Sequence, residues 1–369
     1  MDYWRLSKCS IFHPQHLTIS PVAVWNSSAR KYINVSYRRV FVRKSLDEIC
    51  HYVEVDVSKE ERKFFHKHGI MQVRCLSQYI TEGRDSYDAK YGFHPVTTVY
   101  IDDIDEETQK DSATVTIIGR SKARDIIDSK WSGTVLGSPT LLQILRQIAG
   151  EFGFEEKDVI CMPTTAGDIT KPVFSFSWEN ESPWSKLLTL ADAQGFIITS
   201  NQLGGLYIER PARGVCDWGF AIQEGVNTKN MRRNESGSEQ FHEYIVNCCN
   251  KVGRAIDKTC PNKRKLTINL SEFNIDQEKL DRRAKTEMLR RREDKIVCPL
   301  SGWGLSEAQI QRLGGTYHKE IFWEVNLLIP VKLPTFGLNA TMLISQVEYT
   351  ADARTFSCDV TLVKPEAYR

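Results

Sequence analysis

Short runs in which apolar and polar residues alternate lie toward both ends of the chain, and they constrain the fold more than any other feature. In the first half they occupy residues 39–43, 52–57, 71–76, 96–101 and 113–118. Successive side chains of a strand point to opposite faces, so this alternation is typical of half-buried β-strands. The acidic residues 102–107 are predicted to form a turn. An antiparallel barrel-like or sandwich domain is therefore expected over residues 31–119.

Residues 120–212 follow a helical period instead. Ser138 and Pro139 precede an apolar stripe that stops at Gly153, and Ser182 and Pro183 precede a second stripe that stops at Gly195. An N-cap serine, a proline in the first turn and a glycine stop are typical of helices. Two strand-like runs then flank the glycine-containing loop 201–205. These residues predict a compact α/β module.

Strand patterns return after residue 212, with a charged helix predicted over residues 275–295. The later strands are expected at residues 243–248, 322–329, 342–349 and 356–363. The predicted class is thus α+β and multidomain: two antiparallel β-barrel-like domains with an inserted α/β module and a charged helix. The second barrel-like domain covers residues 213–369, and parts of the two barrels can be exchanged in chain order. Residues 1–30 are predicted to be an irregular N-terminal extension.

Length and composition narrow the class of protein. The chain has 369 residues, more than one hydrophobic core usually holds, and its formal net charge is +2. It has no uncharged apolar run of the length a spanning helix needs, and its first residues lack the apolar core of a secretory signal. Membrane insertion is therefore not expected, and the protein is expected to act where it is made. The ten cysteines form no Cys-x-x-Cys pair, which favours buried free thiols over a zinc site.

Motifs that carry catalysis are missing from the sequence. It has no nucleophile elbow, no phosphate-binding loop and no His-Glu-x-x-His pattern. His66 and His68 share a strand-like spacing, but solvated loop histidines are the better interpretation. No catalytic, metal or cofactor-binding residue is predicted.

The charged helix contains the most distinctive cluster of charge. Its arginines are predicted to form either a solvated face with i, i+4 ion pairs or a basic surface that faces an acidic partner or DNA. Aromatic side chains do not interleave with them, which argues against a platform for single strands. The candidate residues are Arg282, Arg283, Arg290, Arg291 and Arg292.

Several blocks of the sequence resemble Mu-like phage tail hub proteins. Residues 119–128 (Gly-Arg-Ser-Lys-Ala-Arg-Asp-Ile-Ile-Asp) are similar to that family's Gly-Arg-Asp-Lys-Thr-Ala-Asp-Leu-Ile-Asp block. Tyr100, Ile101 and Asp102 resemble its Gly-Tyr-Ile-Asp strand end, with Val99 in place of the glycine. Similar blocks follow in the same order at residues 141–152, 195–206 and 238–246. The resemblance covers residues 32–365 and leaves the first 30 without a counterpart.

The resemblance implies a structural role in the baseplate of a contractile tail. In that family, two barrel-like domains per chain give a homotrimer with pseudo-sixfold symmetry, which joins a sixfold tail tube to a threefold central spike. The expected partners are therefore two further copies, the spike protein, and the tube and baseplate proteins, with transient non-specific contact to phage DNA. The expected location is the virion tail baseplate, after assembly in the bacterial host cytoplasm.

Two alternatives belong to other classes. A base of a type VI secretion spike is normally followed by a β-helical needle with glycine and valine triplets, which these residues lack. A tail-associated cell-wall hydrolase needs a catalytic motif, and none is present. Large aromatic residues in the late loops are candidate subunit-interface anchors, with a core role as the other interpretation. These residues are Trp303, Phe322, Trp323 and Phe336.

Overall fold

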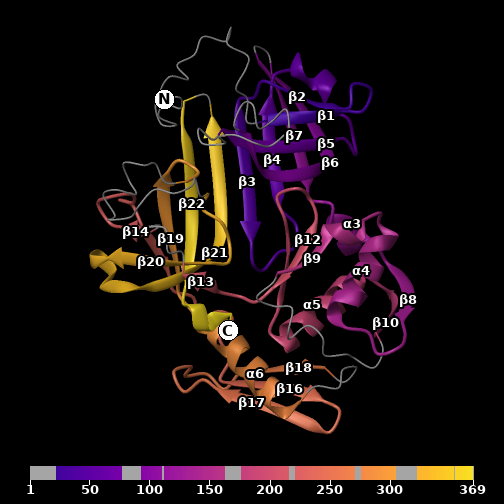
Figure 1. Cartoon of the computed structure of the whole chain (residues 1–369). Helices are drawn as coiled ribbons and strands as arrows, with labels where there is room; N and C mark the ends of the chain where they lie inside the picture. Colours follow the sequence, from indigo (N-terminus) through magenta and orange to yellow (C-terminus); the bar gives the residue numbers. More distant parts are fainter. Residues whose placement is uncertain are drawn as a thin grey trace.

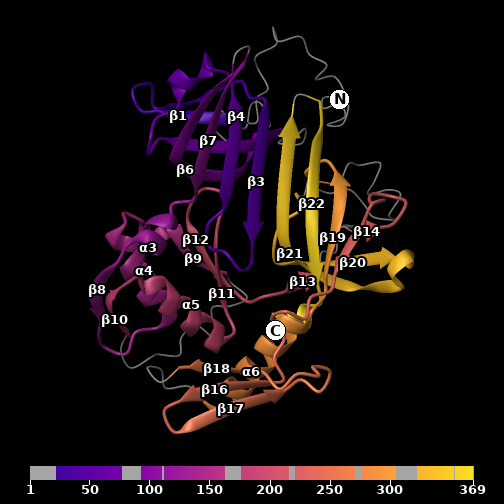
Figure 2. The same cartoon turned by 180° about the vertical axis from the view of Figure 1, so that it is seen from behind.

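The computed structural model describes residues 22–76, 93–109, 112–162, 176–215, 221–270, 276–304, 322–352 and 354–368. Within these ranges the fold is mostly β, with four α-helices. Figures 1 and 2 show one long sheet, an α/β module beside it, and a smaller helix-on-sheet unit at the far end of the molecule. In these ranges, no helix is long and apolar enough to cross a membrane.

The main sheet has fourteen strands from both halves of the chain, and its longest path runs in the order β15-β19-β22-β21-β3-β4-β7-β6-β5-β1-β2. Strand β20 pairs with β21 and carries β13 and β14 off this path. The strands are β1 Val22–Asn26, β2 Lys31–Asn34, β3 Arg39–Ser45, β4 Tyr52–Val57, β5 Ile70–Leu76, β6 Phe93–Gln109, β7 Ser112–Arg120, β13 Arg213–Val215, β14 Ile222–Gln223, β15 Arg232–Asn234, β19 Lys295–Ser301, β20 Leu327–Leu333, β21 Leu338–Asp352 and β22 Phe356–Val363.

The two halves of this sheet meet where β3 pairs with β21. The strands are antiparallel, with Val42 opposite Tyr349 and Val40 opposite Ala351. All four side chains are fully buried, because each strand turns alternate residues to the same face. The alternation at both ends of the sequence therefore builds one continuous hydrophobic core.

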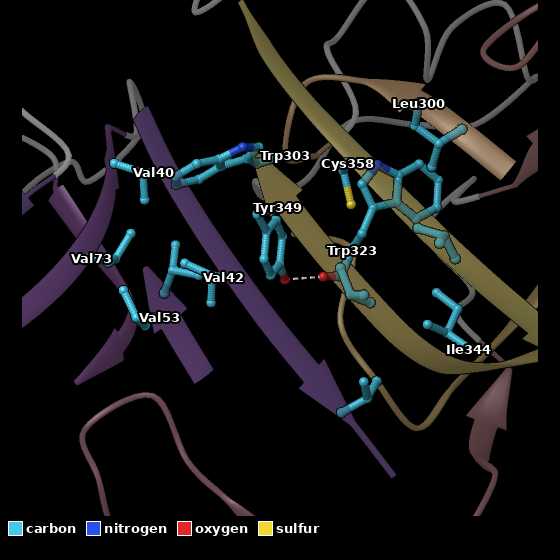
Figure 3. Packing of buried hydrophobic residues seen from close by; sticks show 14 of the residues in the cluster. Val40, Val42, Val53, Val73, Leu300, Trp303, Trp323, Ile344, Tyr349 and Cys358 are labelled. Atoms are coloured by element: carbon cyan, nitrogen blue, oxygen red, sulfur yellow. Dashed lines mark hydrogen bonds between the residues drawn. The ribbon is translucent and has the colours of Figure 1, made fainter. Parts of the chain in front are cut away.

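Aromatic side chains fill the centre of that core (Figure 3). Trp303 and Trp323 have no exposed surface, and the Tyr349 ring lies 5.5 Å from the Trp303 ring, centroid to centroid. The Trp303 indole N–H donates to the Thr350 carbonyl at 3.0 Å, and the Tyr349 hydroxyl donates to the Trp323 carbonyl. Buried aromatic groups need such partners for their polar atoms, so the three rings fix one packing arrangement.

The α/β module contains the helices and strands α3 Arg124–Asp128, β8 Trp131–Val135, α4 Leu141–Glu151, β9 Val159–Cys161, β10 Phe176–Glu181, α5 Pro183–Gln194, β11 Ile197–Ser200 and β12 Leu206–Glu209. Ser182 caps α5 by accepting a hydrogen bond from the Trp184 amide at 3.2 Å, and Gly195 ends the helix with φ +78°. Both features were predicted. The predicted cap of α4 lies too early in the chain: Thr140, not Ser138, accepts the bond from the Gln143 amide.

A smaller unit is inserted in the second half of the chain, and we call it the α6 unit. It comprises β16 Glu243–Cys248, β17 Lys251–Ile256, β18 Lys265–Asn269 and α6 Gln277–Arg292. Helix α6 covers one face of this three-stranded sheet. Its apolar residues, such as Tyr244 and Leu280, join the hydrophobic cluster of the α/β module and not the core of the main sheet.

Four details of the structure can be compared with the predicted domains and elements. The α6 unit separates from the barrel-like domain expected over residues 213–369, because its core is shared with the α/β module. Strands from residues 31–119 and 213–369 share one sheet, and the described residues show no closed barrel. Residues 22–30, expected to be irregular, form β1 and the turn after it, while residues 1–21 lie outside the described ranges. The acidic residues 102–107 lie within β6.

Close packing of α6 on β17 depends on Gly253. A Cβ atom there would lie 2.3 Å from the Leu280 backbone carbon, a clash that no rotamer change relieves. We expect Gly253→Ala to destabilise the protein by about 2–3 kcal/mol, measured by urea unfolding. Gly150→Ala on α4 is the matched control. A Cβ there meets nothing within 4 Å, so it should stabilise by roughly 0.5–1 kcal/mol. Equal effects would contradict this account.

A buried ion pair braces the same sheet near the β3–β21 junction. The Lys44 ammonium group, whose side chain is 1% exposed, lies 2.8 Å from a Glu324 carboxylate oxygen. Lys44→Met should lower the free energy of unfolding, measured in urea, by about 2 kcal/mol. The reason is that the half-buried Glu324 carboxylate loses the Lys44 charge beside it. The double variant Lys44→Met/Glu324→Leu should regain most of that loss. A double variant no more stable than the single one would show that the loss of stability does not come from breaking this ion pair.

Candidate interaction surfaces

The described residues form no group of three or more His, Cys, Asp or Glu side chains that could hold a metal ion. Three features are relevant: the predicted aromatic anchors, the arginines of α6, and the exposed side of the α6 unit.

Two of the four predicted interface anchors are core residues. Trp303 and Trp323 are 0% exposed and lie inside the main-sheet core, so a partner cannot reach them. Their prediction as anchors is wrong, because sequence alone does not separate a buried aromatic from an exposed one near a loop. Phe322 and Phe336 are half-buried and pack against the same core. Their role at a subunit interface remains a prediction.

Most arginines of α6 form ion pairs with other residues of the chain. Arg283 lies 3.0 Å from an Asp192 oxygen on α5 and 2.9 Å from a Glu287 oxygen. Arg291 lies 2.6 Å from the other Glu287 oxygen. Burial opposes ionisation of Glu287, but the Arg283 charge and the Arg291 hydrogen bond outweigh it and lower the pKa of that carboxyl. Helix α6 is thereby tied to the α/β module.

The remaining arginines differ in exposure. Arg290 lies 3.8 Å from Asp192, and its guanidinium carbon is 4.7 Å from the centre of the Tyr368 ring. Arg292 is 40% exposed and lies 3.8 Å from the buried Asp257. Arg282 is exposed and makes no ion pair within the described ranges. The five arginines of the predicted basic face are therefore not all exposed. Arg283 and Arg290 lie where α6 packs against α5, at a contact that we call the seam.

A small cavity lies in this seam, where α5, α6 and the C-terminal segment meet. Its volume is about 30 Å³, and its walls include Asp192, Phe196, Arg282, Arg283, Arg290 and Tyr368. The Tyr368 hydroxyl donates to Asp47 at 2.8 Å, which links the seam to the loop after β3. This site was not predicted from the sequence, since its residues come from distant segments. The arginine cluster was the only signal for it.

The segment that forms the α6 unit is more positively charged than the chain as a whole. Residues 243–292 contain 13 Lys and Arg and 7 Asp and Glu, a net charge of +6 against +2 for the whole chain. Lys258 and Lys263 are exposed in the loop between β17 and β18. On β17, Val252 and Ile256 are 41% and 55% exposed beside Arg254. The unit thus presents a basic surface interspersed with apolar residues.

Comparisons with known proteins agree with this architecture. No protein-family model matches the chain. The baseplate hub protein gp44 of Escherichia phage Mu is 24% identical over 283 residues, which make up 71% of this chain and 70% of that protein.

Solved structures extend the similarity to nearly the whole fold. The 43 kDa tail protein of prophage MuSo2 from Shewanella oneidensis superposes with a TM-score of 0.69 at 20% identity, over 94% of this chain and 98% of that one. The E. coli c3393 protein, a type VI secretion component described as similar to T4 gp27 and gp5, gives 0.53 at 10% identity, over 95% and 75%. The chain is therefore similar in sequence to the Mu baseplate hub protein, and it has the fold of the MuSo2 prophage tail protein.

Proposed function

We propose that this protein is a structural baseplate hub of a contractile phage or prophage tail, joining the tail tube to the central spike. The observation that carries the proposal is the similarity to the Mu hub protein over 71% of the chain, together with the shared fold of the MuSo2 tail protein over 94%. The function then resides in binding surfaces and requires no catalytic group. The protein assembles in the bacterial host cytoplasm and ends in the virion tail baseplate.

The test of this role is genetic. Inactivating the gene in the phage or prophage should abolish complete tails, and the wild-type chain supplied in trans should restore them. Complete, contractile tails without the protein would contradict the proposal. A hydrolase would behave differently, since it would leave assembled particles that fail to digest peptidoglycan.

A type VI spike base is the second candidate, and the likeness to c3393 favours it. The two roles differ in what they bind. A phage hub should co-purify with tail tube and baseplate proteins of its own particle, whereas a secretion spike should appear outside cells that lack such particles.

A closed homotrimer is the assembly we propose. The main sheet draws on both halves of each chain, so three copies can present six comparable β-faces to a sixfold tube. Head-to-tail contacts that close generate such a ring. The half-buried Phe322 and Phe336 are the anchors we assign to those contacts, because aromatic residues dominate interface energies.

The trimer predicts a solution mass of three chains, measured by light scattering at several protein concentrations and two salt levels. A monomer on its own would mean that the ring needs a partner to close, and co-expression with the spike protein should then give three chains per complex. A chain that stays monomeric in that complex would contradict the ring.

Contact with DNA during ejection is assigned to the α6 unit. Positive charge near a channel attracts phosphates without reading sequence, and Lys258 and Lys263 carry exposed charge free of ion pairs within the described residues. Arg290 and Arg291 are less suitable, since reversing them would break the seam.

Charge reversal tests this assignment. Lys258→Glu/Lys263→Glu should slow DNA transfer several-fold in a potassium-efflux or DNA-entry assay, because it turns two attractive charges into repulsive ones. Assembly should be unchanged. The control Lys59→Glu/Lys67→Glu alters two exposed lysines near β5, at the opposite end of the molecule (Figure 1). Identical rates of DNA transfer for the wild type, the Lys258→Glu/Lys263→Glu variant and the control variant would exclude a DNA contact at this loop.

A further inference from the structure

The seam between α5 and α6 holds more positive than negative charge. Arg282, Arg283 and Arg290 line its cavity, and within the described part of the chain Asp192 is the one carboxylate in the wall. Glu287 lies behind it and is shared by Arg283 and Arg291. Asp47 also approaches, and the hydrogen bond it accepts from the neutral Tyr368 hydroxyl leaves its negative charge in place. Counted together, the guanidinium groups of Arg282, Arg283, Arg290 and Arg291 face the carboxylates of Asp192, Glu287 and Asp47. The seam therefore keeps a formal surplus of one positive charge.

Two buried donors in this wall have no acceptor among the described residues. The Nε–H groups of Arg283 and Arg290 are both buried and make no hydrogen bond. The Arg283 side chain is only 10% exposed, and that of Arg290 is 26% exposed. A buried donor without an acceptor costs free energy, so a group that accepts from these atoms would stabilise the seam.

Helix dipoles explain part of this arrangement but not all of it. Helix α5 ends at Gly195, which also lines the cavity, and the carbonyl end of a helix acts as roughly half a negative charge. That partial charge offsets some of the surplus. It does not cancel a surplus of one charge, and it gives neither Nε–H group an acceptor among the described residues.

We propose that this cavity is a binding site for a small oxyanion, either a free phosphate or the carboxylate of an acidic side chain in a partner protein. A volume of about 30 Å³ is room for roughly two water molecules, which is enough for two oxygen atoms of such an anion. Guanidinium groups bind carboxylate and phosphate oxygens through paired, charge-assisted hydrogen bonds. Arg282 is the entry residue, because it is exposed and also reaches the cavity wall.

The site joins three parts of the fold. Asp192 belongs to the α/β module, the arginines to the α6 unit, and Tyr368 to the C-terminal segment that follows β22. An anion bound between these three parts would hold them together. Asp192 already does this in part, because it pairs with arginines of α6.

The first experiment uses inorganic phosphate and the purified full-length chain. Isothermal calorimetry at constant ionic strength, balanced with chloride, should give saturable binding of one phosphate per chain. Arg282→Gln should weaken it about tenfold, since one charge-assisted contact is lost. Lys285→Gln, an exposed residue of the same helix that does not line the cavity, should leave the affinity unchanged. Neither variant should lower the unfolding midpoint, because both side chains are exposed.

The second experiment separates the two sources of the anion, and it alone rests on the proposed hub function. If free phosphate is the ligand, Arg282→Gln chains should enter tails normally despite the weakened binding. If a partner's carboxylate is the ligand, Arg282→Gln should reduce incorporation into tails while Lys285→Gln does not.

The proposal fails if wild-type chains bind no phosphate and Arg282→Gln tails assemble normally. It also fails if both substitutions weaken binding equally, which would indicate diffuse attraction to the helix surface. Wild-type chains that never enter tails would refute the hub function and leave the calorimetric result standing.

Discussion

The pairing of β3 with β21 is the contact on which the remaining structure depends. It joins a strand near the start of the chain to one near its end, and its buried residues, such as Val42 and Tyr349, form the middle of a single core. Because the sheet continues through this junction, the chain between β3 and β21 has to leave the sheet and return to it. The α/β module and the α6 unit are the parts that leave it, and they pack against each other through a second hydrophobic cluster. The two clusters explain why the molecule has a long sheet with its helices gathered to one side (Figure 2).

Local features of this fold could be predicted from the sequence because local physics determines them. Alternation places β3, β4 and β7, and the Ser182 cap and Gly195 stop bound α5. The β3–β21 pairing could not be predicted in this way, since the register between distant strands depends on complementary faces that no short window contains. Trp303 and Trp323 illustrate the same limit. Each stands near segments that look like loops, yet each has its indole in the core.

The ion-pair partners of the α6 arginines include residues that are far away in the sequence. Taken alone, residues 282–292 have the composition of an exposed basic helix, and the i, i+4 pair of Glu287 and Arg291 could be expected from spacing. Asp192 could not, because it lies on another helix and approaches only after α5 and α6 pack together. The positive charge of α6, by contrast, is a property of composition, so the sequence alone reveals it.

The β3–β21 junction also sets an order of events during synthesis. Closing a contact between chain ends carries a large loop-closure cost, and domains fold as their residues emerge from the ribosome. Strands β3 to β7 and the α/β module can assemble early, while β3 keeps an open edge until β21 and β22 are made. An open edge is a template for pairing with other chains. Translation speed and chaperone access over the last third of the message therefore decide whether that edge meets its own β21 or another chain.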